Sequence, residues 1–225
     1  MQYIHPSAIL TKHVKLGSGV FIGPNCSIGF PGFQFYQRED ESIETVIGNN
    51  SIIMGNSVVC LGSKIGANSR LDYHSYVGEQ TSIGEFCVVE YGGRIYDKVE
   101  INSQTTISGF ICNYATIGSN SVVQGELLHK FKDVDDGQIE PPPIVGNECF
   151  IGKKALIVGH IEIASGSYIS AGSIVTKSTK AYKLYSGNPA KEIGNAPKSY
   201  LNGVSQFNEK RIKEIHEIIN RYTKL

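Results

Sequence analysis

An aliphatic residue recurs every six positions from Ile47 to Ile107 without one interruption. This period matches neither the 3.6 residues of an α-helical turn nor the two-residue alternation of a flat strand. The residue four places after each aliphatic is usually small, and the series begins with Ser51, Ser57, Ser63, Ser69 and Ser75. The chain is therefore built from a six-residue repeat, and this repeat restricts the fold more than any other feature.

The same frame holds near the start, from Ile4 to Ile28, and again from Val145 to Val175. A hexapeptide period is typical of parallel β-helices, in which each short strand stacks on the strand one coil earlier. Three hexapeptides per coil give a triangular prism, with the aliphatic residues inside. The third residue after the aliphatic is expected at a corner, in the left-handed backbone region that Gly and Asn tolerate. Such residues are Gly19, Asn25, Asn50, Asn56, Gly62, Asn68, Asn120, Gly166 and Gly172.

Two excursions interrupt the repeat, at about residues 30–44 and 129–143, and the second ends in three consecutive prolines. The step from Ile107 to Ile111 is four residues instead of six, which predicts one tightened corner. We expect one β-helix domain over residues 1–180 and an extended segment over 181–203. The three-four spacing of apolar residues then predicts an amphipathic helix over 204–225.

Composition excludes several classes of protein. Lys plus Arg and Asp plus Glu are equal at 21 each, so the chain lacks the positive charge expected of a nucleic-acid-binding protein. No leader-like N-terminus and no membrane-spanning stretch are visible, so we expect a cytoplasmic protein. The five cysteines form no CxxC pair and fit repeat positions, which predicts small buried residues and neither disulfides nor a metal site.

The repeat resembles that of the left-handed β-helix acyltransferases over about residues 3–180, and the handedness is implied by this resemblance. The segments 144–152, 171–177 (AGSIVTK) and 187–191 (GNPAK) resemble the C-terminal half of hexapeptide acetyltransferases that act on sugars, antibiotics and related small molecules. Residues 28–35 are also similar to the aromatic glycine loop of acyltransferases of lipid A biosynthesis. The resemblance implies acetyl-CoA as acyl donor, a sugar or nucleotide sugar as acceptor, and a homotrimer with sites between subunits.

Enzymes of this family generally use a histidine as general base. His13, His74 and His160 each lie three after an aliphatic, so we interpret them as left-handed corner residues. His129 fits no repeat position and lies where the chain leaves the prism, so it is the first candidate for the base. In relatives with a coil histidine, that histidine falls two after the aliphatic. Here Tyr73 holds that place, which makes His74 the second candidate.

Acidic residues near His129 are candidates for orienting its imidazole. Glu126 lies three residues earlier, and the second excursion contains Asp133, Asp135 and Asp136. The ordinary alternative for the three aspartates is a solvated acidic loop.

The resemblance also implies residues for the acyl donor. A pantetheine arm between two prisms would contact the backbone near Gly152, Ala171 and Gly172. Lys177 and Lys191 are candidates for the phosphates of coenzyme A. No metal is expected.

These features favour an acetyl-CoA-dependent O- or N-acetyltransferase of glycan biosynthesis, working by direct transfer with a histidine base. A non-catalytic β-helix scaffold is the main alternative. A γ-type carbonic anhydrase would need three imidazoles on one zinc ion. We expect no close histidine pair, because His129 and His160 are 31 positions apart. A nucleotidyltransferase would need an additional Rossmann-like domain.

Overall fold

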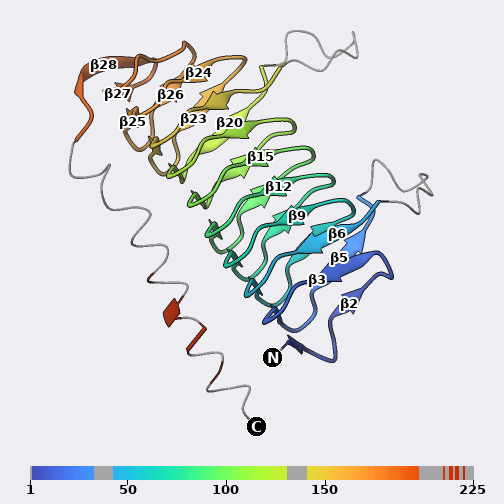
Figure 1. Ribbon diagram of the computed structural model, residues 1–225. Coiled ribbons are helices and arrows are strands. Elements are labelled where there is room, and N and C mark those ends of the chain that lie inside the picture. The colour runs from blue at the N-terminus through green and yellow to red at the C-terminus, as the bar shows by residue number, and fades with distance from the viewer. Residues whose placement is uncertain are drawn as a thin grey trace, which may run out of the picture.

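The computed structural model describes residues 2–32, 43–130 and 141–197 and, near the C-terminus, residues 210, 213–214, 216–217 and 220. The first three ranges form stacked coils around one core, and each coil passes through three parallel sheets in turn (Figure 1). The fold is the predicted left-handed parallel β-helix.

Sheet A contains β1 (Tyr3–Ile4), β4 (Phe21–Ile22), β7 (Ile52–Ile53), β10 (Arg70–Leu71), β13 (Val88–Val89), β16 (Thr106–Ile107), β19 (Val122–Val123), β22 (Phe150–Ile151), β25 (Tyr168–Ile169), β27 (Lys183–Gly187) and β28 (Ala190–Asn195). Sheet B contains β2 (Ile9–Leu10), β5 (Ser27–Phe30), β8 (Val58–Cys60), β11 (Tyr76–Val77), β14 (Arg94–Ile95), β17 (Phe110–Ile111), β20 (Glu126–Leu128), β23 (Leu156–Val158) and β26 (Ile174–Val175). Sheet C contains β3 (Val14–Leu16), β6 (Thr45–Ile47), β9 (Lys64–Ile65), β12 (Ser82–Ile83), β15 (Glu100–Ile101), β18 (Thr116–Ile117), β21 (Ile144–Val145) and β24 (Glu162–Ile163).

The strands stack in register, so that aliphatic residues of successive coils lie directly above one another. Leu71 pairs with Ile53 on one side and Val89 on the other, for example, and all three side chains are buried. Neighbouring residues of a strand point to opposite faces, so one residue of each two-residue strand fills the prism and the other points outward. The six-residue period is thus the spacing between successive inward side chains.

The corners confirm the predicted backbone conformation. All nine Gly and Asn residues expected in the left-handed region have φ between 55° and 78°. Phe86 and Tyr114 adopt the same conformation in equivalent places, although bulky side chains disfavour it by roughly 1–2 kcal/mol. The position in the coil therefore imposes the conformation, and the residue type only lowers its cost.

The prediction for the three corner histidines is right only for His74, whose φ is 60°. His13 and His160 are not among the residues with positive φ. At His160 the preceding Gly159 takes the left-handed place instead, with φ of 88°. At His13 the chain turns differently, because the Val14 N–H donates to the Thr11 carbonyl oxygen across a short turn.

The tightened corner after Ile107 is confirmed, because β17 ends at Ile111, four residues later. A second one follows Val123, where the next inward residue is Leu127. Glycines make both corners possible, since a Cβ atom on Gly109 would overlap the carbonyl group of Gly125. This second shortening was not predicted, and it makes Leu127 the inward residue of β20.

After the last coil, the expected extended segment of residues 181–203 is described as far as residue 197. It contains an antiparallel hairpin, β27 and β28, that continues sheet A by pairing with β25. Near the C-terminus the described residues 210, 213–214, 216–217 and 220 are helical, and the rest of the predicted helix over 204–225 lies outside the described residues. In the part of the chain that the structure describes, no helix has the length and apolar character needed to cross a membrane.

The three outer faces differ in character. On face A the outward side chains of Ile52 and Val88 are buried, and those of Phe150 and Tyr168 are half-buried. Face C carries exposed polar or charged residues such as Lys64, Ser82 and Glu100. Face B carries a cluster of aromatic rings, Tyr76, Tyr96 and Phe110.

Candidate active site

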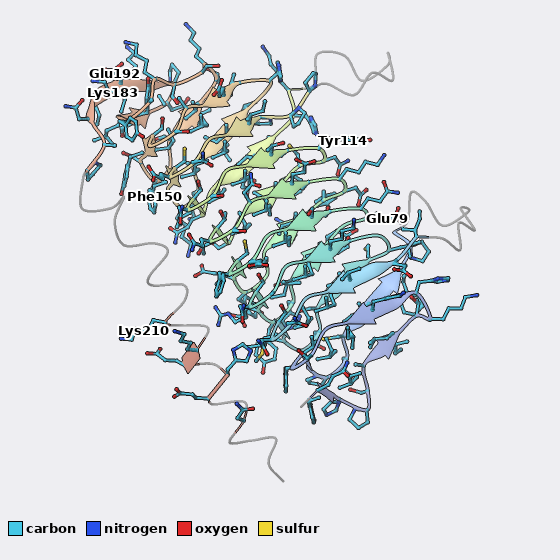
Figure 2. The ribbon with its side chains drawn as sticks, viewed as in Figure 1. Glu79, Tyr114, Phe150, Lys183, Glu192 and Lys210 are labelled. Atoms are coloured by element: carbon cyan, nitrogen blue, oxygen red, sulfur yellow. The ribbon has the colours of Figure 1, made fainter. Side chains whose placement is uncertain are left out.

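Two of the predicted site residues, His129 and Lys177, lie along one edge of the prism, between sheets B and C, which we call the B/C edge. Both excursions leave the coils here. Because successive B strands are in register, the residues two places after each inward aliphatic form one column along this edge. The column contains Leu61, Glu79, Asp97, Asn113, His129, Gly159 and Lys177. Figure 2 shows Glu79 and Tyr114 on this side of the prism and Phe150, from sheet A, on the opposite side.

His129 belongs to this column. Leu127 is the buried inward residue of its strand and pairs with Ile111 below and Ile157 above. His129 therefore lies two places after an inward aliphatic, and the prediction that it falls outside the repeat is wrong. The unpredicted four-residue corner after Val123 is the cause. The position it does occupy is the one that the family resemblance gives to a coil histidine, and the half-buried side chain lies at the start of the second excursion.

A hydrogen-bonded ladder runs along the column through the coils that precede His129. The backbone N–H of Glu79 donates to Asp97 Oδ1 at 2.8 Å, and the backbone N–H of Asp97 donates to Asn113 Oδ1 at 3.0 Å. Glu79 is buried, and its carboxylate also accepts the backbone N–H of Gly32. The ladder thus connects the root of the first excursion to the coil next to His129.

His160 lies on the coil that pairs with the coil of His129. Strand pairing places residue 129 beside Gly159, because the second excursion fills most of the interval between the two coils. The Nδ1 atom of His160 is 3.3 Å from the Pro142 carbonyl oxygen, so His160 contacts the point where the excursion returns. Among the described residues no group of three or more His, Cys, Asp or Glu side chains could hold a metal ion.

The other two candidates for acid–base chemistry lie elsewhere. Glu126 is half-buried on the outer face of β20, where it pairs with Leu156, and does not belong to the corner column. His74 is exposed on the A/B edge, between sheets A and B, and its ring contacts Tyr91 at a centroid distance of 5.4 Å. Asp133, Asp135 and Asp136 lie outside the described residues.

Three of the predicted donor-binding residues lie together on the A/B edge of the last coils. A Cβ atom on Gly152 would approach the Ala171 nitrogen to 2.6 Å, which shows how closely these coils pack. The space beside Gly172 is open, since nothing would lie within 4 Å of a Cβ atom added to it. Lys177 lies instead in the B/C column, two coils beyond His129. Lys191 lies in β28 opposite Ser186.

The cysteines are buried and unpaired with one another, as predicted. Cys112 is nearest to the candidate site, because the backbone N–H of His129 lies against its sulfur. Burial raises the pKa of the Cys112 thiol to about 12, an effect larger than the lowering by this N–H. A thiol with such a pKa is almost entirely protonated at neutral pH, so Cys112 is unsuited to act as a nucleophile.

A pocket of about 610 Å³ lies on face C beside the end of the first excursion. Its walls include Glu44, Lys64, Gln80 and Ser82. It lies near the N-terminal coils, and none of the predicted catalytic or donor-binding residues lines it. The column, and not this pocket, therefore defines the candidate site.

Comparisons with known proteins agree with the fold and the predicted resemblance. No protein-family model matches the chain. The bifunctional protein GlmU of Latilactobacillus sakei is 29% identical over 174 residues, which cover 77% of this chain and 33% of that protein. A probable macrolide acetyltransferase of Lysinibacillus sphaericus is 29% identical over 132 residues, which cover 54% of this chain and 63% of that protein.

Among solved structures, the UDP-N-acetylglucosamine O-acyltransferase of Moraxella catarrhalis matches with a TM-score of 0.55 and 20% identity, over 99% of this chain and 86% of that one. The chain is thus a hexapeptide-repeat protein with the left-handed β-helix fold. Its resemblance to the acyltransferases that share this fold is confirmed. It spans about a third of the length of the GlmU proteins it matches.

Several residues of the column were missed by sequence reasoning. Glu79, Asp97 and Asn113 lie two places after Val77, Ile95 and Ile111, so the repeat does contain their position. The signal that could have found them is a run of polar residues at this one place in successive B/C corners.

Proposed function

We propose that the chain is an acetyl-CoA-dependent acetyltransferase that acylates a hydroxyl or amine of a sugar or nucleotide sugar, with His129 as general base. The observation that carries the proposal is the place of His129. It lies two after an inward aliphatic, at the root of an excursion, in a column of polar side chains. The similarity to an acetyltransferase relative supports the reaction class. The acyltransferase of shared fold suggests nucleotide sugars as the first acceptors to test.

In the proposed reaction the neutral imidazole of His129 accepts the proton of the acceptor hydroxyl or amine while that atom attacks the thioester carbonyl carbon. The C–S bond breaks as the tetrahedral intermediate collapses. The proton held by His129 then goes to the departing sulfur, which gives the acetylated acceptor and the free thiol of coenzyme A. Imidazole suits both steps because its ordinary pKa lies close to neutral pH.

The predicted donor site lies between subunits, so the proposal includes a homotrimer. The side chains of face B support this part. Its rings form a connected cluster, with Tyr76 and Tyr96 at 5.6 Å and Tyr96 and Phe110 at 4.9 Å between centroids. Connected apolar side chains on an outer face are typical of subunit contacts. Sedimentation equilibrium would measure the oligomeric state, and a monomer would contradict the trimer.

The catalytic proposal is tested by release of coenzyme A from acetyl-CoA in the presence of a panel of nucleotide sugars and amino sugars. We expect His129→Ala to lower kcat by about 10²–10⁴-fold, the usual contribution of a general base. His74→Ala is the matched control, because His74 lies on another edge, and it should leave kcat within a few-fold of the unmodified protein. Circular dichroism confirms that both variants are folded.

Two results would contradict the proposal. A loss of turnover in His74→Ala, with His129→Ala unaffected, would move the base to the A/B edge. A folded protein that neither binds coenzyme A in calorimetry nor turns over acetyl-CoA would instead favour the non-catalytic scaffold.

A further inference from the structure

Asn113 is held in one orientation by the ladder on the B/C edge. A backbone N–H can donate only to the oxygen of a carboxamide, and the Asp97 N–H lies 3.0 Å from Asn113 Oδ1. The oxygen therefore faces the coil of Asp97. The Nδ2 group lies in the same amide plane, and its N–H that is anti to the oxygen is directed away from that contact.

The neighbouring coil on the other side is the one that carries His129. Ile111 pairs with Leu127, so residues 113 and 129 lie on adjacent coils, whose spacing is about 4.8 Å. The backbone contacts agree, because the Cys112 N–H donates to the Leu127 carbonyl oxygen at 3.2 Å and the His129 N–H lies against the Cys112 sulfur. Asn113 is only half-buried, so a ligand beside His129 can reach its amide.

A second N–H group near His129 already has an acceptor. The backbone N–H of Gly159, on the coil beyond His129, donates to the Leu128 carbonyl oxygen at 2.9 Å. Acyl transfer from a thioester places negative charge on the carbonyl oxygen, and enzymes stabilise that charge with preorganised N–H donors. A donor for this oxygen is therefore needed near His129, and the Asn113 amide is oriented in advance.

We propose that Asn113 is a further catalytic residue, whose Nδ2 group donates a hydrogen bond to the thioester oxygen as that oxygen becomes an oxyanion. The inference rests on the proposed function, because it needs a thioester reacting at His129. The amide neither gains nor loses a proton in the step. It stabilises the oxyanion formed when the acceptor attacks. That oxygen loses its negative charge when the C–S bond breaks and the carbonyl group forms again.

The decisive variant is Asn113→Asp. Aspartate has nearly the same shape and keeps an oxygen for the Asp97 N–H, but it replaces the Nδ2 donor by a second acceptor. We expect kcat to fall by about 10²–10³-fold, the loss measured when one oxyanion donor is removed elsewhere. The KM values for acetyl-CoA and for the acceptor should change little, because the bond forms only in the transition state.

Asn147→Asp is the matched control. Asn147 occupies the same place in the repeat on the edge between sheets C and A, and its Oδ1 accepts the Ser119 N–H at 2.9 Å. The two variants should unfold at similar urea concentrations, and Asn147→Asp should keep its kcat. This comparison separates a catalytic role from the structural role that both asparagines share.

The inference is overturned if Asn113→Asp keeps kcat within about three-fold of the unmodified protein, or if its only kinetic effect is a higher KM for the acceptor. The first result together with a strong loss in His129→Ala would refute the role of Asn113 and leave the proposed function standing. Absence of acetyl-CoA turnover in the unmodified protein would refute both.

Discussion

Two edges of the prism use the same repeat for different purposes. On the C/A edge, between sheets C and A, the residue after the inward aliphatic is glycine in most coils: Gly17, Gly48, Gly66, Gly84, Asn102, Gly118, Gly146 and Ala164. On the B/C edge the same place holds Gly29, Cys60, Gly78, Tyr96, Cys112, Leu128, Val158 and Thr176. The C/A edge brings backbones into close contact, whereas the B/C edge has room for side chains.

The inner sides of both edges carry a series of small polar residues, each of which donates to a carbonyl group of the next coil. On the B/C edge Ser63 Oγ donates to Gly78 O at 2.5 Å and Thr81 Oγ1 donates to Tyr96 O at 2.7 Å.

The C/A edge has equivalent bonds. Ser51 Oγ donates to Gly66 O at 2.8 Å and Ser69 Oγ donates to Gly84 O at 2.9 Å, while the Cys87 N–H donates to Ser69 Oγ at 3.0 Å. We call this series the C/A spine. The glycine contacts, and not the spine, therefore distinguish the C/A edge from the B/C edge, where both excursions leave the coils.

The largest expected effect tests the close contact of the C/A edge. A Cβ atom on Gly66 would lie 2.6 Å from the Glu85 nitrogen, and the obstructing atoms are backbone. Gly66→Ala should therefore destabilise the protein by about 3 kcal/mol, near the upper end for overpacking. Gly92→Ala is the control, since nothing lies within 4 Å of its added Cβ and only its φ of 68° opposes the change. Urea unfolding measures both, and equal losses would contradict the close contact.

The next effect concerns the spine itself. Ser69→Ala removes the donor to Gly84 O and the acceptor for the Cys87 N–H, and it leaves two buried backbone groups without these bonds. We expect a loss of about 2 kcal/mol in the free energy of unfolding, as is usual for unsatisfied buried polar groups. The exposed Ser82→Ala should change it by less than about 0.5 kcal/mol. If the two losses were the same, the spine would not stabilise the C/A edge.

A smaller effect depends on pH and concerns cysteines of both edges. Burial raises the pKa of the Cys60 and Cys149 thiols to about 11 and that of Cys87 to about 12. Above about pH 9 the unfolded chain releases protons that the folded chain keeps, so the free energy of unfolding should fall with rising pH. Urea midpoints at pH 7, 9 and 10.5 measure this fall. Cys87→Ala should reduce the slope above pH 9, and an unchanged slope would contradict a buried protonated thiol.

The smallest effect is expected from Cys112, although it touches the backbone of His129. Because its pKa is raised to about 12, the thiol contributes no nucleophile, and Cys112→Ala should keep kcat within about three-fold. Acetyl-CoA turnover measures this, with Asn113→Asp as the contrasting variant from the same corner. A loss of kcat as large as that in Asn113→Asp would show that packing at this corner, rather than the amide donor, controls the reaction.

Much of the fold could be predicted because the repeat is local. Each hexapeptide contains its own inward aliphatic, its corner residue and its small residue, so the inward series and the conformation of the nine Gly and Asn corners are confirmed. The candidate site was harder to predict, because it depends on which coils lie next to one another. The missed four-residue corner after Val123 placed His129 outside the repeat, and the length of the second excursion hid the fact that the coil of His129 pairs with the coil of His160.

The period and the residue types are enough to predict the prism and its buried cysteines, whereas the choice of His129 rests on the family resemblance and on a repeat frame that misses the corner after Val123. Only the tertiary structure decided what surrounds His129. The column of His129 also contains Asn113, Gly159 and Lys177. The lengths of the shortened corners and excursions place these residues at the same point of successive coils. Strand pairing aligns residues of neighbouring coils. The coil in which a residue lies depends on the lengths of all the corners and excursions that precede it.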